Sequence, residues 1–415
     1  MSKTAAEDDD VDYDVVVTGA GPVGLTAALV LGRAGRRVLV LEAEAEPATQ
    51  WRASTFHPPT LELAEELGLI DDMLAQGLVA PTYQLRTRTG ELIAEFDFSN
   101  LADVTRYPYR LQLEQYKYVR ILVAKLAAEP TVEVRFSHRA TGHESTDRGV
   151  SVFVAGHSSE YSVTGQFLIG ADGARSLIRQ DLDVEFEGMT YEHRYLLLGL
   201  DAPIEEYFPG ISYVNYVADP DEHKMLLRIP DCWRVMFEVA TGPSDADVVG
   251  DAFIEDRLSS LFHPNPLPEV LSRQVYRVHQ RVAGEFRRGP VALIGDAAHV
   301  NSPIGGMGLN SGVHDAYTLA QVLVGESADD LDQWASRRRA VALSEIQRIT
   351  HRNTRDLSIG EKDSRVRELR EISEDPQRAR EWMLEASMIA SARKQGLVPE
   401  RVLQRAGAVS TPFPS

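Results

Sequence analysis

Three glycines near the start of the chain have the spacing of a phosphate-binding turn. Gly19, Gly21 and Gly24 form GxGxxG directly after the β-rich run YDVVVT and at the opening of the helical run PVGLTAALVLGRAG. The first glycine permits the tight turn, the second lets the backbone approach a pyrophosphate, and the third lets the helix lie close to the strand. Pro22 opens the helix, and Glu42 ends the next strand, where a carboxylate can accept hydrogen bonds from ribose hydroxyls. The motif predicts an ADP-containing cofactor and does not by itself separate FAD from NAD.

Two distant dipeptides repeat the arrangement of strand, turn and helix. Asp172-Gly173 follows the apolar run FLIGA, and Gly295-Asp296 follows VALI. An acid at the carboxyl end of a strand is well placed to hold ribityl hydroxyls. The loop SPIGGMGLN after Asp296 leads into a helix. If that helix faces the pyrimidine edge of an isoalloxazine, its N-terminus stabilises negative charge on the reduced flavin.

Composition narrows the classes of function. The chain has 415 residues, with 43 Lys+Arg against 62 Asp+Glu and a net charge of −19, which argues against nucleic-acid or anionic-membrane binding. The sequence has no HExxH or clustered metal-ligand set, and no GxSxG elbow of a hydrolase. Its apolar stretches fall well short of the roughly 20 residues that span a bilayer. The single cysteine, Cys232, and the start MSKTAAEDDD indicate a reducing, cytoplasmic setting.

The elements that must position these residues alternate between strands and helices. Residues 13–42 have the pattern of a βαβ unit, and residues 85–98 alternate like a strand pair. Residues 194–239 are strand-rich, and the chain from Asn310 onward is mostly helical. We predict an α/β fold in which a Rossmann-like cofactor-binding domain is interleaved with a β-sheet substrate domain, followed by a helical C-terminus. The expected parts are an acidic arm (1–12), the cofactor domain (13–185 with 275–345), the substrate-domain sheet (186–274), and C-terminal helices with a tail (346–415).

The three motifs together resemble those of the class A flavoprotein aromatic hydroxylases, the para-hydroxybenzoate hydroxylase superfamily, over about residues 13–324. That family carries GxGxxG, DG and GD in this order. The segment YRVHQRVAGEFRRGPVALIGDAAH is also similar to the phenol-hydroxylating branch that includes para-nitrophenol 4-monooxygenase. The resemblance implies an FAD-binding domain, NADH or NADPH and O2 as co-substrates, and a small aromatic substrate. The resemblance is also compatible with a homodimer.

The resemblance also implies cofactor contacts for individual residues. Glu42 is expected at the adenosine ribose, Arg52 at an FAD phosphate, and Gln115 at the flavin. The alternatives are a surface arginine for Arg52 and an ordinary helix-face residue for Gln115. Arg234 matches an arginine involved in flavin movement, with a surface salt bridge as its alternative. The remaining expected contacts are Asp172 and Gly173 of the DG motif, Gly295 and Asp296 at the ribityl chain, Pro303 with its carbonyl near flavin and substrate, and Gly306, Gly308, Leu309 and Asn310 along the flavin ring.

Two side chains are candidates for contact with the substrate, beside Pro303. By the resemblance, Tyr216 in ISYVNYV matches a tyrosine that hydrogen-bonds the phenol oxygen, with core packing as its alternative. Arg228 in KMLLRIP is flanked by apolar residues, so it either extends to solvent or pairs with an anionic substrate. His299 is expected to be a packed or capping residue rather than an acid–base group.

The resemblance implies a monooxygenase reaction. NAD(P)H reduces the flavin, O2 adds at its C4a carbon, and the terminal oxygen of the hydroperoxide passes to an electron-rich ring. The protein then has to exclude water, position the ring and help deprotonate a phenol. The alternatives are an epoxidase, a Baeyer–Villiger-type oxygenase or a prenyl reductase on the same fold, and a flavin-binding protein that makes no product.

Overall fold

The computed structural model describes residues 11–325 and 328–397. The predicted acidic arm lies outside the described residues except for its last two positions, and so does the tail after residue 397. Within the described residues the strands form two eight-stranded sheets and a three-stranded sheet. The architecture is therefore mixed α/β, as predicted.

The first sheet contains the predicted βαβ unit. β1 (Tyr13–Thr18) and β2 (Val38–Leu41) pair in parallel, and α1 (Pro22–Arg33) connects them. Pro22 suits the first helical position because its missing N–H has no partner there in any helix. β1 also pairs in parallel with β11 (Glu160–Gly170), the strand that leads into Asp172. The sheet order is β17 (Arg287–Arg288), β18 (Val291–Leu293), β11, β1, β2 and β8 (Val132–Arg135), with β10 (Gly149–Ala155) and β9 (Arg139–Thr146) extending from β11.

The second sheet is antiparallel apart from one pair. Its order is β19 (His299–Val300), β16 (Glu269–Ala283), β12 (Phe186–Asp201), β15 (Cys232–Val239), β14 (Lys224–Ile229), β13 (Val214–Ala218), β5 (Thr82–Thr87) and β6 (Leu92–Asp97). The exception is the parallel pairing of β13 with β5. The third sheet joins β3 (Thr55–Phe56), β7 (Arg110–Gln112) and β4 (Leu78–Ala80).

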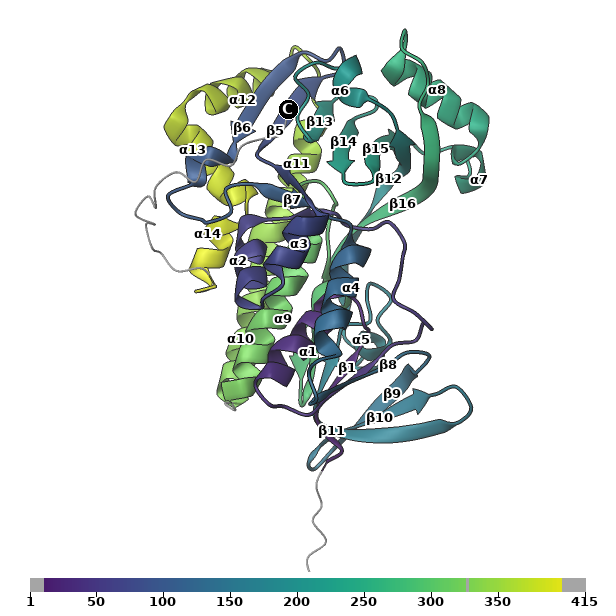
Figure 1. Cartoon of the computed structure of the whole chain (residues 1–415), viewed down its shortest axis with the longest axis vertical. Coiled ribbons are helices and arrows are strands. Elements are labelled where there is room, and N and C mark those ends of the chain that lie inside the picture. The colour runs from purple at the N-terminus through teal and green to yellow at the C-terminus, as the bar shows by residue number, and fades with distance from the viewer. Residues whose placement is uncertain (1–10, 326–327, 398–415) are drawn as a thin grey trace, which may run out of the picture.

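Helices cover the first sheet and flank the second. The bounds are α2 (Pro58–Glu66), α3 (Ile70–Gln76), α4 (Gln115–Leu126), α5 (Leu177–Asp181), α6 (Ile204–Tyr207), α7 (Asp245–Val248), α8 (Asp251–Phe262), α9 (Gly308–Gly325), α10 (Ala328–Val341), α11 (Arg348–Leu357), α12 (Ser364–Glu374), α13 (Pro376–Ala386) and α14 (Ile389–Lys394). In Figure 1, α1, α4, α9 and α10 stand together in the lower half, and the second sheet fills the upper half. The C-terminal α12 and α13 lie beside β5 and β6, which come from the first quarter of the chain.

The second sheet buries both of its faces, and strand alternation decides which residue serves which face. Met225 and Tyr216 belong to the apolar cluster shared with Ile304 and the C-terminal helices. Leu226 and Val217, one residue further along each strand, belong to the cluster on the opposite face with α8. The first of these two faces is the one that adjoins the glycine-rich loop.

The division between the two parts differs from the expected boundaries. The strand pair within residues 85–98 exists as β5 and β6, but both strands join the second sheet rather than the cofactor domain. The second sheet also extends to Ala283 through β16 and takes in β19. The physical reason is long-range pairing, since β5 finds its parallel partner β13 far along the chain and no local pattern encodes that choice.

Two kinds of feature are absent from the described residues. None of their helices is both long enough and apolar enough to cross a bilayer. None of their His, Cys, Asp and Glu side chains gather in threes at a place that could hold a metal ion.

Candidate active site

The glycine turn after β1 has the geometry of a phosphate site. A Cβ on Gly19, where φ is +102°, would lie 2.5 Å from the Ala171 carbonyl oxygen, and one on Gly24 would lie 2.1 Å from the Gly19 carbonyl oxygen. A Cβ on Gly21 would meet nothing within 4 Å in the described chain, so this side of the turn is open. No side chain there caps α1, and its first turn contains no acidic residue. The N–H groups of α1 are therefore available to an anion.

Glu42 is fixed beside that turn. Its Oε2 accepts a hydrogen bond from the Ala20 N–H at 2.7 Å, and its Oε1 accepts one from the Glu44 N–H at 2.9 Å. These two bonds hold the carboxylate at the end of β2, next to the open side of Gly21. The position fits the predicted contact with an adenosine ribose.

Asp172 caps a helix. Its carboxylate accepts hydrogen bonds from the Ser176 hydroxyl at 2.5 Å and from the Leu177 N–H at 2.7 Å, at the start of α5. Gly173, with φ +82°, makes the turn between them. Arg179 of α5 donates to the Ala297 carbonyl at 2.8 Å, which links the DG and GD motifs. The predicted contacts of Asp172 and Gly173 with FAD or NAD(P)H stay predictions.

The GD motif opens toward the second sheet. Gly295 has φ +59°, and Asp296 is accessible to solvent. The groups packed around its carboxyl nevertheless desolvate it and raise its pKa, against the effects of His299 and Arg52. Desolvation and the Asp296 carboxylate raise the pKa of Tyr276 on β16 to about 12, and Arg52 opposes this shift. The acid predicted for the ribityl chain and the arginine predicted for a phosphate thus approach the same tyrosine, between the two sheets.

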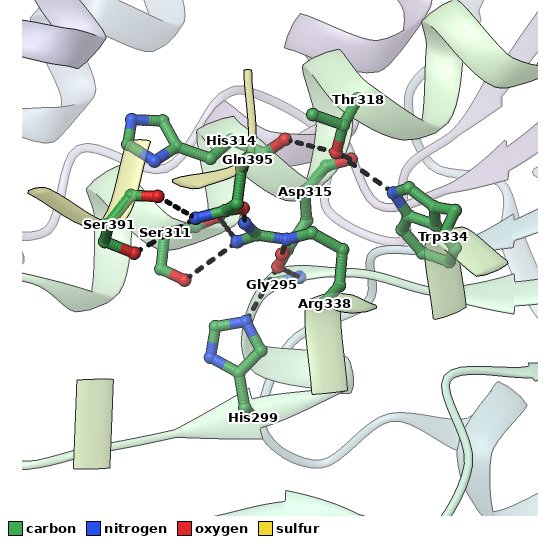
Figure 2. Close-up of polar contacts among 10 residues, drawn as sticks. All are labelled: Gly295, His299, Ser311, His314, Asp315, Thr318, Trp334, Arg338, Ser391 and Gln395. Atoms are coloured by element: carbon green, nitrogen blue, oxygen red, sulfur yellow. Dashed lines mark hydrogen bonds and ion pairs between the residues drawn. The ribbon is translucent and has the colours of Figure 1, made fainter. Parts of the chain in front are cut away.

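Asp315 on α9 holds the GD motif on both sides of Asp296 (Figure 2). Its Oδ2 accepts the Gly295 N–H at 3.1 Å and lies 2.7 Å from His299 Nε2, while its Oδ1 accepts from Arg338 Nε at 2.6 Å. Burial opposes ionisation of this carboxyl, but Arg338 and His299 outweigh it and lower the pKa of Asp315 to about 2. His299 is buried, as a packed residue should be. The motif analysis did not single out Asp315, although this residue lies within the part of the chain that the family resemblance covers.

The glycine-rich loop is tied down by Asn310. Its Nδ2 donates to the Thr55 carbonyl at 2.8 Å and the Gly306 carbonyl at 2.7 Å, and its Oδ1 accepts the His57 N–H at 2.9 Å. Asn310 therefore fixes the loop through its side chain. Pro303 accepts the Gly306 N–H at 3.0 Å, which closes the turn that precedes α9. Gly308 begins α9, and the Leu309 side chain is buried.

Arg234 and Gln115 flank the segment that carries Arg52. The buried Arg234 donates through Nη1 to the Arg52 carbonyl, and burial lowers the pKa of Arg234 to about 10. The alternative of a surface salt bridge for Arg234 is wrong, since the residue is buried. Gln115 opens α4, and its N–H donates to the Ala53 carbonyl at 2.9 Å. The Arg52 side chain itself is exposed.

Buried polar atoms along these elements lack partners within the described chain. They include Arg234 Nε, Gln112 Nε2 and His57 Nδ1. Such atoms are costly to bury unless something hydrogen-bonds them. Together with the open turn at Gly21 and the uncapped end of α1, they fit a long cofactor with a diphosphate at one end and a polar ring system at the other.

A cavity with about 390 Å³ of empty space lies on the cluster side of the second sheet, where the glycine-rich loop meets the C-terminal helices. Tyr216 is part of its wall, and so is Gly305 of the loop. The contact of Tyr216 with a phenol oxygen stays a prediction. The sequence did not identify Tyr83, Arg110 and Trp382, which also line it. The only local signal for Arg110 is a charge within the apolar and aromatic run YPYRLQL. The three residues lie far apart in the chain, so their spacing does not indicate a shared site.

Arg228 does not reach this cavity, which corrects the prediction that it contacts the substrate. On β14 it lies on the side of Leu226, opposite Met225. Its Nη1 donates to the Ile229 carbonyl at 2.6 Å, and its Nε lies 3.6 Å from Glu205. The two-residue period of the strand turns it to the opposite face.

Comparisons with known proteins agree with this arrangement. Residues 12–348 match the family described as FAD binding domain. The chain is 37% identical over 339 residues to para-nitrophenol 4-monooxygenase of Pseudomonas sp. strain WBC-3, covering 79% of this chain and 83% of that protein. It is 36% identical over 379 residues to 6-hydroxy-3-succinoylpyridine 3-monooxygenase of Pseudomonas putida strain DSM 28022 / S16, covering 88% and 95%.

A solved structure gives the same result for the fold. The crystal structure of p-nitrophenol 4-monooxygenase PnpA from Pseudomonas putida DLL-E4 superposes with a TM-score of 0.85 at 33% identity, covering 90% of this chain and 98% of that one. The resemblance drawn from the three motifs is confirmed, and so is FAD as the cofactor. The chain belongs to the FAD-binding family of flavoprotein aromatic monooxygenases.

Proposed function

We propose that this enzyme hydroxylates a phenolic or other activated aromatic small molecule in the cavity between Tyr216 and the glycine-rich loop. One observation supports this site above the rest: an aromatic-walled cavity of about 390 Å³ adjoins the loop expected to line the flavin. Walls made mostly of apolar and aromatic side chains with a few polar groups are typical of small-ligand sites. The relatives named above act on a nitrophenol and a hydroxypyridine, as their names state.

FAD is proposed to lie in the cleft between the two sheets. Glu42 and the α1 N-terminus at Gly21 would hold its ADP part, Arg52 a phosphate, and Asp296 the ribityl chain. Gln115, Arg234 and the backbone from Pro303 to Gly308 would surround the ring. When bound, FAD supplies electron transfer from NAD(P)H to O2 and the activation of O2 for transfer to a ring.

The protein's own residues then act on the substrate. The hydroxyl of Tyr216 lies 3.2 Å from Arg110 Nη1, so it has a fixed orientation in the cavity wall. Trp382 donates to the Tyr83 hydroxyl at 2.7 Å and closes the wall that α13 contributes. Such fixed groups orient a ring and exclude water from the reacting atoms. We assign the cofactor part to the first sheet and the substrate part to the second sheet. The reducing, cytoplasmic setting stays a prediction.

The test is a panel of phenols, aromatic acids and hydroxypyridines offered to the FAD-loaded protein with NADH and with NADPH. We expect at least one compound to stimulate NAD(P)H oxidation and to gain one oxygen atom, measured by mass spectrometry. Flavin reduction by NAD(P)H without any oxygenated product across the panel would favour an electron-transfer or binding role.

A further inference from the structure

Arg338 of α10 is a buried cation behind the GD turn (Gly295–Ala297). The residue is 2% exposed, and its Nε donates to Asp315 Oδ1 at 2.6 Å. The other oxygen of that carboxylate, Oδ2, contacts the Gly295 N–H and His299 Nε2, as Figure 2 shows. Asp315 therefore uses one oxygen for the arginine and the other for the turn.

The rest of the guanidinium is held by two further helices. Its Nη2 donates to the carbonyl and to the hydroxyl of Ser311 on α9, both at 3.2 Å, and its Nη1 donates to Gln395 Oε1 at the end of α14. Gln395 Nε2 in turn donates to the Ser391 carbonyl at 2.9 Å and hydroxyl at 3.0 Å. A planar guanidinium bound on several sides has one direction available. The C-terminal α14 is thus connected to the GD turn through Gln395, Arg338 and Asp315.

The charge of Arg338 decides the form of Asp315. Burial raises the pKa of the Asp315 carboxyl, but Arg338 of α10 and His299 of β19 together bring this pKa down to about 2. The neighbouring His314 of α9 contributes no charge at pH 7, because burial lowers its pKa to about 3. Arg338 is the member of this group that keeps its positive charge at every physiological pH.

An ionised Asp315 is what the GD turn requires. Its Oδ2 serves two donors, the Gly295 N–H at 3.1 Å and His299 Nε2 at 2.7 Å. A carboxylate accepts such bonds more strongly than a neutral oxygen, above all where water is excluded. Asp296 lies between these two residues in the chain. The two bonds therefore fix the backbone on either side of the carboxylate proposed for the ribityl chain.

We propose that Arg338 is a positioning residue for FAD: its charge keeps Asp315 in the ionised form that holds the GD turn in its FAD-binding geometry, and Gln395 of α14 fixes the guanidinium in place. The inference rests on the proposed position of the ribityl chain at Asp296. It adds a residue that acts through Asp315 and extends the FAD site to the C-terminal helix.

The first test measures FAD affinity in variants of Arg338. FAD is removed from the full-length protein and titrated back, with flavin fluorescence as the signal. Arg338→Met should raise the FAD dissociation constant tenfold or more, and Arg338→Lys should recover part of the affinity because it keeps the charge. Arg337→Met is the matched control, since that arginine is the preceding residue of α10 and is exposed. It should bind FAD as wild type does.

The second test separates positioning from stability. Removing one member of a buried ion pair leaves the other charge uncompensated, whereas removing both charges is often tolerated. The double variant Asp315→Asn/Arg338→Met should therefore unfold in urea closer to wild type than Arg338→Met does. Its FAD dissociation constant should stay at least tenfold above the wild-type value, because a neutral amide oxygen then faces the GD turn. If Arg338→Met does not fold, the double variant and Arg338→Lys decide.

The pH dependence of FAD affinity gives a readout of the charge itself. Without Arg338, burial should raise the pKa of Asp315, so Arg338→Met should lose affinity as the pH falls from 8 to 6. We expect this loss to exceed the wild-type loss by threefold or more. Asp296 has a pKa raised by burial in wild type and remains in both proteins, so the difference between them reports Asp315.

Wild-type FAD affinity in the double variant would overturn the inference, and so would equal affinities of Arg338→Lys and Arg338→Met or equal pH profiles of Arg338→Met and wild type. Weak FAD binding by Asp296→Ala with wild-type binding by Arg338→Met would uphold the proposed FAD site and overturn the role of Arg338. Weak binding by Arg338→Met and by the double variant, with Asp296→Ala at the wild-type value, would uphold that role and remove Asp296 from the site.

Discussion

Glu42 and Asp296 both follow strand ends, but they differ in how many carboxylate lone pairs remain free to accept hydrogen bonds from a ligand. Both oxygens of Glu42 already accept backbone N–H groups, which fix the side chain beside the glycine turn. Asp296 is instead accessible to solvent, and Gly295 before it and His299 after it both bond Asp315. Glu42 therefore acts from a rigid position, whereas Asp296 has its acceptor capacity available to hydroxyl groups.

Asp296→Ala should weaken FAD retention without unfolding the chain. The substitution removes an exposed carboxylate and leaves Gly295 and His299 bonded to Asp315. We expect at least a tenfold rise in the FAD dissociation constant, about the value of one charge-assisted hydrogen bond. Flavin absorbance of the purified protein and its thermal midpoint give the two readouts, with the exposed Asp332→Ala as control. Full flavin occupancy in Asp296→Ala would remove this residue from the cofactor site.

Tyr216→Phe should slow hydroxylation and uncouple it from NAD(P)H oxidation. The ring stays in the wall, but Arg110 Nη1 loses its oxygen partner at 3.2 Å and the substrate loses a hydroxyl. We expect a fall of tenfold or more in oxygenated product per NAD(P)H consumed. Tyr207→Phe, on the opposite face of the sheet, should leave that ratio unchanged. The same ratio in Tyr216→Phe and wild type would make the tyrosine a packing residue only.

Residues within the motifs could be predicted from the sequence, and those between the motifs could not. Gly19 and Gly24 are predictable because a Cβ at either position would collide with backbone atoms, so only glycine fits. Gly295 is predictable because its φ of +59° is one that L side chains rarely adopt. Arg110 and Trp382 act through where the fold places them, far apart in the chain. Arg228 was misplaced because a charge flanked by apolar residues does not show which face of a strand it occupies.

At the scale of elements, the proposed FAD site depends on how closely α9 approaches α1. A Cβ on Gly312 of α9 would lie 2.7 Å from Val23 Cγ2 of α1 and 3.2 Å from the Gly295 Cα. The same helix carries Asp315, which bonds the GD turn. The separation of the two helices thus sets the positions of the turn proposed for the diphosphate and of the turn proposed for the ribityl chain.

Gly312→Ala should destabilise the fold and loosen FAD together. Adding a methyl group at a packed contact costs about 1–3 kcal/mol, and here the atoms displaced belong to the two cofactor turns. Gly325→Ala is the matched control in the same helix, because a Cβ there meets nothing within 4 Å in the described chain. We expect its free energy of unfolding to equal the wild-type value or slightly exceed it. Urea unfolding and flavin content measure both effects, and equal values for the two variants would contradict the close contact.

The pairing of strands that lie far apart in the chain could not be predicted from the sequence. The βαβ unit and the β5–β6 hairpin are local, and hydrophobic periodicity together with turn residues predicts them. The parallel pairing of β5 with β13 and the long β12–β16 ladder join segments distant in the chain. Such pairings depend on the whole sheet. The predicted boundary at residue 185 falls just before β12, whereas the one at residue 275 falls inside β16.

At the scale of the whole molecule, buried neutral histidines couple stability to pH. Burial, aided by Arg338, lowers the pKa of His314 to about 3, below the ordinary value near 6.5. The unfolded chain therefore takes up a proton between pH 6.5 and 3 that the folded chain refuses. By linkage, the stability that the neutral histidine preserves is present above pH 6.5 and is lost as the pH falls.

The free energy of unfolding should fall by about 2 kcal/mol at pH 5 relative to pH 7.5 because of His314 alone. His314→Gln removes the titrating group, so its loss over that interval should be smaller than that of wild type by about this amount. Urea titrations at both pH values measure the difference, and comparison at pH 7.5 gives the cost of the substitution itself. An equal loss in both proteins would show that His314 takes up its proton without unfolding.

The cavity wall from α11 and α13 is encoded after the last cofactor motif. Asp356 and Trp382 come from this late stretch, whereas the glycine turns proposed to hold FAD all precede residue 312. Sequence changes or recombination confined to α11–α13 can therefore alter substrate selectivity and leave the segments proposed to bind FAD unchanged. Exchanging residues 348–386 between relatives offers a direct way to transplant selectivity.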